Sequence, residues 1–230
     1  THGKHVAGTV AGAGIREEKN KGFAPAATII SQTFSGIITN SPAYVKDHNM
    51  VVTNNSYGAV TGDCEYAGSY DIISYILDQQ AFEMPNLQHV FAVGNDGTVS
   101  CSPYPTGFHT VLGGFQSAKN IITVGGMNYN NSSKGPVKDG RLKPEIMVQG
   151  SGIVSTGNNN GYFTSNGTSN AAPSVSGGLA LLYQQYRQQN GNTDPKSGLM
   201  KALICNGGAD LGNAGPDFRN GYGLMNLNRS

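Results

Sequence analysis

The pattern of apolar and polar residues predicts short strands that alternate with helices. Continuous apolar runs at 90–93 and 121–124 are typical of strands buried on both faces, and shorter strands are expected at 26–31 and from residue 51. Helices are expected over residues 1–12, 36–49, 71–82, 169–187 and 195–206. This alternation predicts a mostly parallel sheet with helices on both faces. The length of 230 residues suits one α/β domain rather than two.

The loop before the fourth predicted helix delivers a serine to a helix N-terminus. Residues 165–168 are small or polar, and the apolar stripe begins at Ala171, directly after Ser169. Free N–H groups and the helix dipole favour negative charge there, which suits a nucleophilic serine and the oxyanion that it creates. The alternative is an ordinary Ser/Thr cap with Pro173 in the first turn.

Two other segments carry candidate chemistry. His2 and His5 fall on one face of the small-residue helix expected at the start of the chain. Asn95 lies in a glycine-flanked turn directly after the strand that ends at Val93. Each has an ordinary alternative, because a histidine near a terminus can be solvated and an Asn-Asp-Gly turn is common.

Together these segments resemble the subtilisin-like serine proteases, or subtilases. The motifs are His-Gly-Lys-His-Val-Ala-Gly from His2, Ala-Val-Gly-Asn-Asp-Gly around Asn95 and Gly-Thr-Ser-Asn-Ala-Ala-Pro around Ser169, in the order of the family. Weaker matches at 22–25, 55–58, 143–146 and 221–226 extend the resemblance over almost the whole chain. The resemblance implies a serine endopeptidase with Ser169 as nucleophile, His2 as general base and Asn95 as an oxyanion-hole donor.

The resemblance also implies where a polypeptide substrate lies. Ser56, Tyr57 and Gly58 would form the strand edge that pairs with an extended peptide, and residues around Ser35 and Gly36 would form the opposing edge. Gly94 would help to form the floor of the pocket for the residue before the scissile bond.

The third catalytic residue of the family is an Asp on a strand upstream of the histidine. Only Thr1 precedes His2, and the context of Asp63, Glu65, Asp71 and Asp96 places none of them behind it. We therefore expect a single subtilisin-like domain over residues 1–230 that is incomplete at its N-terminus, with the Asp on a separate N-terminal segment. The alternative is a catalytically impaired fragment or a non-catalytic domain that binds peptides or has a structural role.

Two residues near the motifs depart from the family. Asn170 follows the nucleophile where an apolar residue is usual, so its amide needs a partner or solvent. Lys4 separates the two histidines, and it is either a solvated side chain or a charge that lowers the pKa of His2.

The resemblance implies a Cys64–Cys101 disulfide, because the loops that carry these cysteines flank the same face of the sheet in the family, and the alternative is two free thiols with no role. Such a bond favours a secreted, oxidising location. Cys205 lies in an apolar stretch and is expected to be a buried small hydrophobe.

The composition of the chain limits the classes of binding partner that we expect. Charged residues make up 13% and the formal net charge is +1, so nothing points to nucleic acid or an anionic membrane. No apolar run approaches the roughly 20 residues of a membrane span. No cofactor is expected. Subtilases often bind structural calcium, but no residues here stand out as a metal site.

Overall fold

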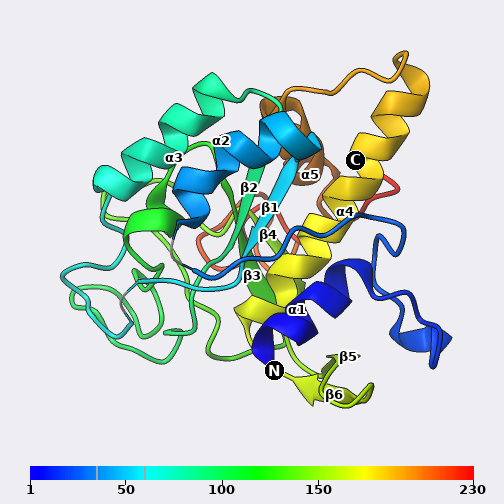
Figure 1. Ribbon diagram of the computed structural model, residues 1–230. Coiled ribbons are helices and arrows are strands. Elements are labelled where there is room, and N and C mark those ends of the chain that lie inside the picture. Colours follow the sequence, from blue (N-terminus) through cyan, green and yellow to red (C-terminus); the bar gives the residue numbers. More distant parts are fainter. Residues whose placement is uncertain (35, 60) are drawn as a thin grey trace.

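The computed structural model describes residues 1–34, 36–59 and 61–230 and is built around a parallel sheet (Figure 1). Its strand order is β1-β2-β3-β4, in which neighbouring strands are parallel. The strands are β1 (Val52–Asn55), β2 (Gln88–Ala92), β3 (Ile122–Met127) and β4 (Ile146–Gln149). A separate antiparallel pair is formed by β5 (Ile153–Thr156) and β6 (Tyr162–Ser165).

Helices occupy the positions that the sequence pattern predicts. They are α1 (His2–Ala11), α2 (Ile37–His48), α3 (Ile72–Glu83), α4 (Thr168–Gln189) and α5 (Ser197–Gly207), with short 3-10 helices η1 (Glu18–Asn20) and η2 (Gly114–Ser117). Asp71 begins α3 with a capping box: its carboxylate accepts from the N–H groups of Ile73 and Ser74. The predicted α/β fold with a parallel sheet is thus confirmed.

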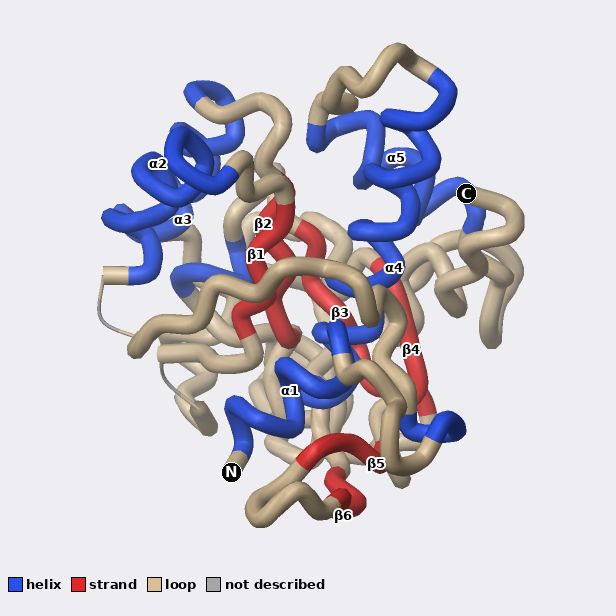
Figure 2. The backbone as a smooth tube through the Cα atoms, turned by 45° about the vertical axis from the view of Figure 1, so that its right-hand side comes forward, coloured by secondary structure: helices blue, strands red, loops and turns tan. Residues whose placement is uncertain are grey.

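Helices lie on both sides of the sheet (Figure 2). Each face of the sheet carries an apolar layer, which is why its strands read as continuous apolar runs. On one face, Val90, Ile122 and Ile146 pack against α4 and α5. On the other, Phe91 packs with Leu77 of α3. The 22-residue helix α4 contacts all four strands, so it fixes its own N-terminus relative to their carboxyl ends.

One predicted strand is wrong. Residues 27–33 have no regular secondary structure, and Ile29 is 43% exposed. An apolar run forms a strand only where a neighbour completes its hydrogen bonds, and β1 pairs only with β2 in the described part of the chain. The outer edge of β1 is therefore open there.

Candidate active site

Ser169 is the second residue of α4, and Gly167 is the residue that precedes the helix. Gly167 has φ +141°, a conformation that side chains rarely adopt. A β-carbon built on it would lie 3.6 Å from Ser169 Oγ and 3.8 Å from Asn95 Oδ1. The hydroxyl of Ser169 and the amide of Asn95 therefore flank the same glycine, although 73 residues separate Asn95 from Thr168.

The Asn95 side chain is oriented by Thr168, a residue to which the sequence motifs gave no role. Asn95 Oδ1 lies 3.0 Å from both the backbone N and the Oγ1 of Thr168. An N–H can only donate, so the oxygen of the amide must face Thr168. The NH2 group of Asn95 is left as a donor, and the side chain is exposed beside Ser169. The signal in the sequence was the Thr of Gly-Thr-Ser, whose hydroxyl also lies 3.1 Å from the carbonyl oxygen of Gly94.

The segment after β1 is tied to the same helix. Ser56 Oγ donates to the carbonyl oxygen of Ser169 at 2.8 Å. The carbonyl of Tyr57 accepts from Gln116 Nε2 at 2.8 Å. Of the residues predicted to bind substrate, Ser56 and Gly94 thus adjoin the Ser169 region, while Ser35 lies outside the described residues.

His2 is the first residue of α1, which packs against the N-terminal half of α4 (Figure 1). Their close approach uses Gly177, where a β-carbon would lie 3.2 Å from the carbonyl oxygen of Val10. Burial, the neighbouring His5 and the amino group of Thr1 all lower the pKa of His2 from 6.5. Within the described residues, the imidazole makes no hydrogen bond to Ser169. Such contacts are often long without substrate.

None of the carboxylates of Asp63, Glu65, Asp71 and Asp96 is among the groups that shift the pKa of His2. Asp71 caps α3, Asp96 accepts from the backbone N–H of Gly62 at 2.8 Å, and Asp63 accepts from the N–H groups of its own turn. No carboxylate of the described residues contributes to the lowered pKa of His2. The neutral imidazole therefore has no anionic partner in this part of the chain.

The two departures from the family have separate outcomes. Asn170 is buried, and its NH2 group donates to Ser165 Oγ at 3.0 Å, whereas its Oδ1 has no partner among the described residues. Lys4 donates to Asn158 Oδ1 at the surface and is not among the causes that lower the pKa of His2. Its ammonium is therefore engaged away from the histidine.

Cys64 and Cys101 form a disulfide with a Cα–Cα distance of 5.3 Å. The bond joins the loop after β1 to the loop after β2, and both loops flank the Asn95 turn. Cys205 is free and only half-buried, and burial raises the pKa of its thiol to about 11. The expectation of a fully buried residue is wrong for Cys205, because the α5 face that carries it is only partly covered.

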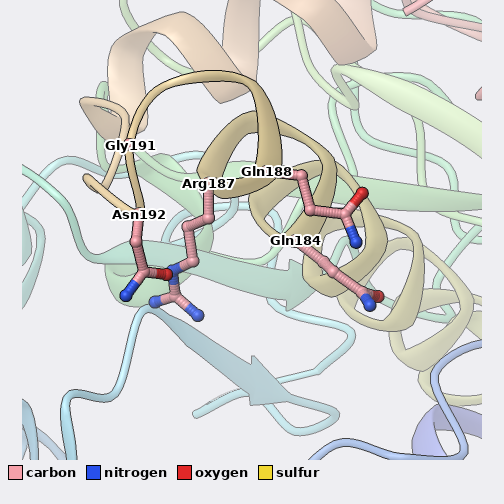
Figure 3. Close-up of a pocket in the computed structure, with 5 residues that line it drawn as sticks. All are labelled: Gln184, Arg187, Gln188, Gly191 and Asn192. Atoms are coloured by element: carbon pink, nitrogen blue, oxygen red, sulfur yellow. The ribbon is translucent and has the colours of Figure 1, made fainter.

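A broad hollow in the surface lies away from this site (Figure 3). It measures about 470 Å³ and is lined by Gln184, Arg187, Gln188, Gly191 and Asn192 at the C-terminal end of α4. At 1.5 Å per residue, Arg187 lies about 27 Å along the helix from Ser169.

The described residues contain no group of three or more His, Cys, Asp or Glu side chains placed to hold a metal ion. None of their helices combines the length and apolarity needed to cross a membrane.

Ser169 and Asn95 thus lie around the same glycine near the carboxyl end of β2, and the helix that carries His2 packs against α4. The profile of the subtilase family matches residues 1–223. The chain belongs to the subtilase family. This is a subtilase protease domain, as the resemblance in the sequence predicted.

The subtilase domain is similar to proteases of diverse origin. It is 27% identical to tripeptidyl-peptidase 2 of Oryza sativa over 250 residues, 100% of this chain and 18% of the relative. It is 28% identical to fervidolysin of Fervidobacterium pennivorans, over 99% of this chain and 34% of the relative. The chain therefore spans about a third or less of the length of these relatives.

The fold of the subtilase domain has solved counterparts. The CspB protease of Clostridium perfringens superposes with a TM-score of 0.78 at 18% identity, over 99% of this chain and 78% of that one. At this identity the likeness concerns the fold.

Proposed function

We propose that the domain is a secreted serine endopeptidase that cleaves polypeptides through an acyl-enzyme on Ser169. The observation that carries the proposal is the orientation of Asn95. Thr168 occupies the amide oxygen at 3.0 Å, which leaves the NH2 group as a donor beside Ser169. A donor held ready where negative charge develops is what acyl transfer requires.

In the proposed reaction, Ser169 Oγ attacks the carbonyl carbon of the scissile peptide bond and its proton passes to the imidazole of His2. The oxyanion accepts from Asn95 Nδ2 and from the backbone N–H of Ser169, which has no partner within the helix. The C–N bond then breaks, and His2 returns the proton to the leaving amine. Water, deprotonated by His2, attacks the acyl carbon and restores the Ser169 hydroxyl.

We also propose that an Asp from outside these 230 residues orients His2, on a separate N-terminal segment. Two observations support this. No carboxylate of the described residues acts on His2. The outer edge of β1 also lacks a strand partner in the described part of the chain. One further strand would satisfy these backbone groups.

The alternative is a domain that binds peptides, or has a structural role, without cleaving them efficiently. The missing carboxylate favours it. In subtilisin, the protease after which the family is named, loss of the Asp alone costs about 3 × 10⁴ in kcat. The retained nucleophile, histidine and oriented amide favour the endopeptidase.

Fluorophosphonate labelling of the whole protein, read by intact mass and peptide mapping, separates the two. We expect one label, on Ser169, and none in Ser169→Ala. Ser151→Ala is the matched control, because that hydroxyl donates only to Asn166 near the surface. Failure of the folded protein to label would contradict the endopeptidase and favour the binding role.

A secreted location is part of the proposal. The Cys64–Cys101 disulfide supports it, because such bonds persist in oxidising compartments. Thiol titration of the protein purified from its native location, without reductant, is expected to count one free thiol from this domain. Three free thiols would contradict the location.

A further inference from the structure

Leu112 lies between the segments that follow β1 and β2, beside the proposed nucleophile. A β-carbon built on Gly58 would lie 2.2 Å from Leu112 Cδ1. One built on Gly94 would lie 2.7 Å from Leu112 Cγ and 3.2 Å from Cδ2. One side chain therefore fills the space that faces both glycines.

The position of Leu112 is fixed by its surroundings. Its backbone N–H donates to the carbonyl oxygen of Val93 at 3.2 Å, and the residue is 6% exposed. Next to it, Gln116 Nε2 joins the two segments by donating to the carbonyls of Tyr57 at 2.8 Å and Ala92 at 3.1 Å. These contacts fix the backbone of Leu112 and the two segments on either side of it.

Leu112 also lines a small cavity. A cavity of about 10 Å³, enough for roughly one water molecule, is lined by the leucine together with Gly62, Asp63, Ala67, Asp96, Val99, Cys101 and Thr110. The Leu112 side chain thus separates the surface beside Gly58 and Gly94 from a cavity beneath the disulfide.

We infer that Leu112 restricts the residue that precedes the scissile bond to Gly, Ala or Ser. This inference rests on the proposed function. The attacked carbonyl must lie within reach of both Ser169 and Asn95, so the side chain on its acyl side starts next to Gly94. An extended peptide along residues 56–58 directs that side chain between Gly58 and Gly94, where Leu112 leaves no room for a ring or a long chain.

The test compares tetrapeptide p-nitroanilides that differ only in the last residue, Ala or Phe, with the whole protein as enzyme. We expect kcat/KM to favour Ala by at least about 100-fold. In Leu112→Ala, we expect the Phe substrate to gain at least about tenfold relative to Ala, the range in which a pocket discriminates by size. Equal cleavage of both substrates by the wild type would overturn the inference, as would an unchanged ratio in the variant.

Val111→Ala is the matched control. Val111 is also buried but packs with Val93 and Val137 in a separate apolar cluster. It is expected to lose stability without changing the substrate ratio. A shift in this variant as large as that in Leu112→Ala would show that general loosening, rather than the removed side chain, changes specificity.

A second pair of variants tests the geometry without catalysis. Gly58→Ala is expected to destabilise the fold because its new methyl group overlaps Leu112. Adding Leu112→Ala should recover most of that loss in urea unfolding. Additive losses would contradict the placement of Leu112. If Leu112→Ala does not fold, cleavage-site mapping of a peptide library by the wild type decides, with Gly, Ala or Ser expected before the cut.

Labelling separates the two proposals. A wild type that labels at Ser169 but cleaves after large residues keeps the endopeptidase and overturns the role of Leu112. A folded wild type that neither labels nor cleaves overturns both.

Discussion

Polar groups at the two ends of the central sheet differ in how fully their hydrogen-bonding atoms are paired. Near the amino ends of β3 and β4, Glu145 is 4% exposed, and both of its carboxylate oxygens are fully used. One accepts from Lys143 at 2.6 Å and Lys201 at 2.7 Å, and the other accepts from the N–H and hydroxyl of Thr123. At the carboxyl end of β2, the oxygen of Asn95 accepts from Thr168, but its NH2 group has no partner among the described residues.

Glu145, Lys143 and Lys201 form a charged cluster. The pKa values of Glu145 and Lys143 show that a buried charge needs a partner of opposite charge to stay ionised. Burial alone raises the pKa of the Glu145 carboxyl, but the charges of Lys143 and Lys201 outweigh it and bring the value to about 2. Burial lowers the pKa of Lys143 to about 8, although Glu145 opposes the change. The group stays ionised at neutral pH because every member has a partner. The NH2 group of Asn95, by contrast, has no partner among the described residues, and under the proposed function it donates to the substrate oxyanion.

The largest effect on stability is expected from Glu145→Ala. The change leaves Lys143 as a buried cation without its carboxylate, which costs about 3–5 kcal/mol of unfolding free energy. Urea denaturation measures the loss. Glu17→Ala is the matched control, because that carboxylate pairs with Lys19 at 3.6 Å on the exposed surface and such pairs contribute little. If the folded fraction of Glu145→Ala labels more slowly at Ser169, the two ends of the sheet are coupled rather than separate.

The same carboxylate makes stability depend on acid. Its folded pKa is depressed, so its contribution is fully present above pH 4.5 and is lost as the pH falls toward 2. Glu145→Gln should therefore remove part of the decline in stability over that range. A decline identical to that of the wild type would contradict the assigned role of the ion pair.

Asn95 is expected to show the opposite behaviour, with a loss of rate and little loss of stability. Asn95→Asp keeps an acceptor for Thr168 but replaces the donor with an anion, so fluorophosphonate labelling should slow by at least about 10²–10³. Asn95→Ala should slow it to a similar degree and also leave the Thr168 N–H unpaired, at about 1 kcal/mol. Labelling of Asn95→Asp at the wild-type rate would contradict the oxyanion role.

The smallest expected effect is a shift in the pH profile. His2 must be neutral to accept a proton, and the described residues lower its pKa below 6.5. A carboxylate supplied from outside the 230 residues acts in the opposite direction. We therefore expect the acid limb of kcat/KM for the whole protein to move to lower pH when the contributed Asp is replaced by Asn. An acid limb that does not move would contradict the contributed Asp.

Much of the fold could be predicted from the sequence, because each correct element is specified locally. The continuous apolar run at 90–93 predicts a strand that is buried on both faces of a parallel sheet. The apolar stripe that begins at Ala171 has helical spacing and predicts a helix. The strand expected at 26–31 failed for the opposite reason. Its apolar pattern is genuine, but a strand also needs a neighbour, and in the described part of the chain there is none.

The sequence by itself determined the family motifs and the order of the elements, since these depend on residue type and short-range spacing. It did not reveal that Thr168 occupies the oxygen of Asn95, nor that Leu112 stands between Gly58 and Gly94. Both are contacts between segments more than 15 residues apart in the chain. These atoms are brought together by tertiary packing: α4 packs against the sheet, and residues 111–117 pack against the ends of β1 and β2. The pattern of residues along the chain does not specify distances between segments that are far apart in sequence.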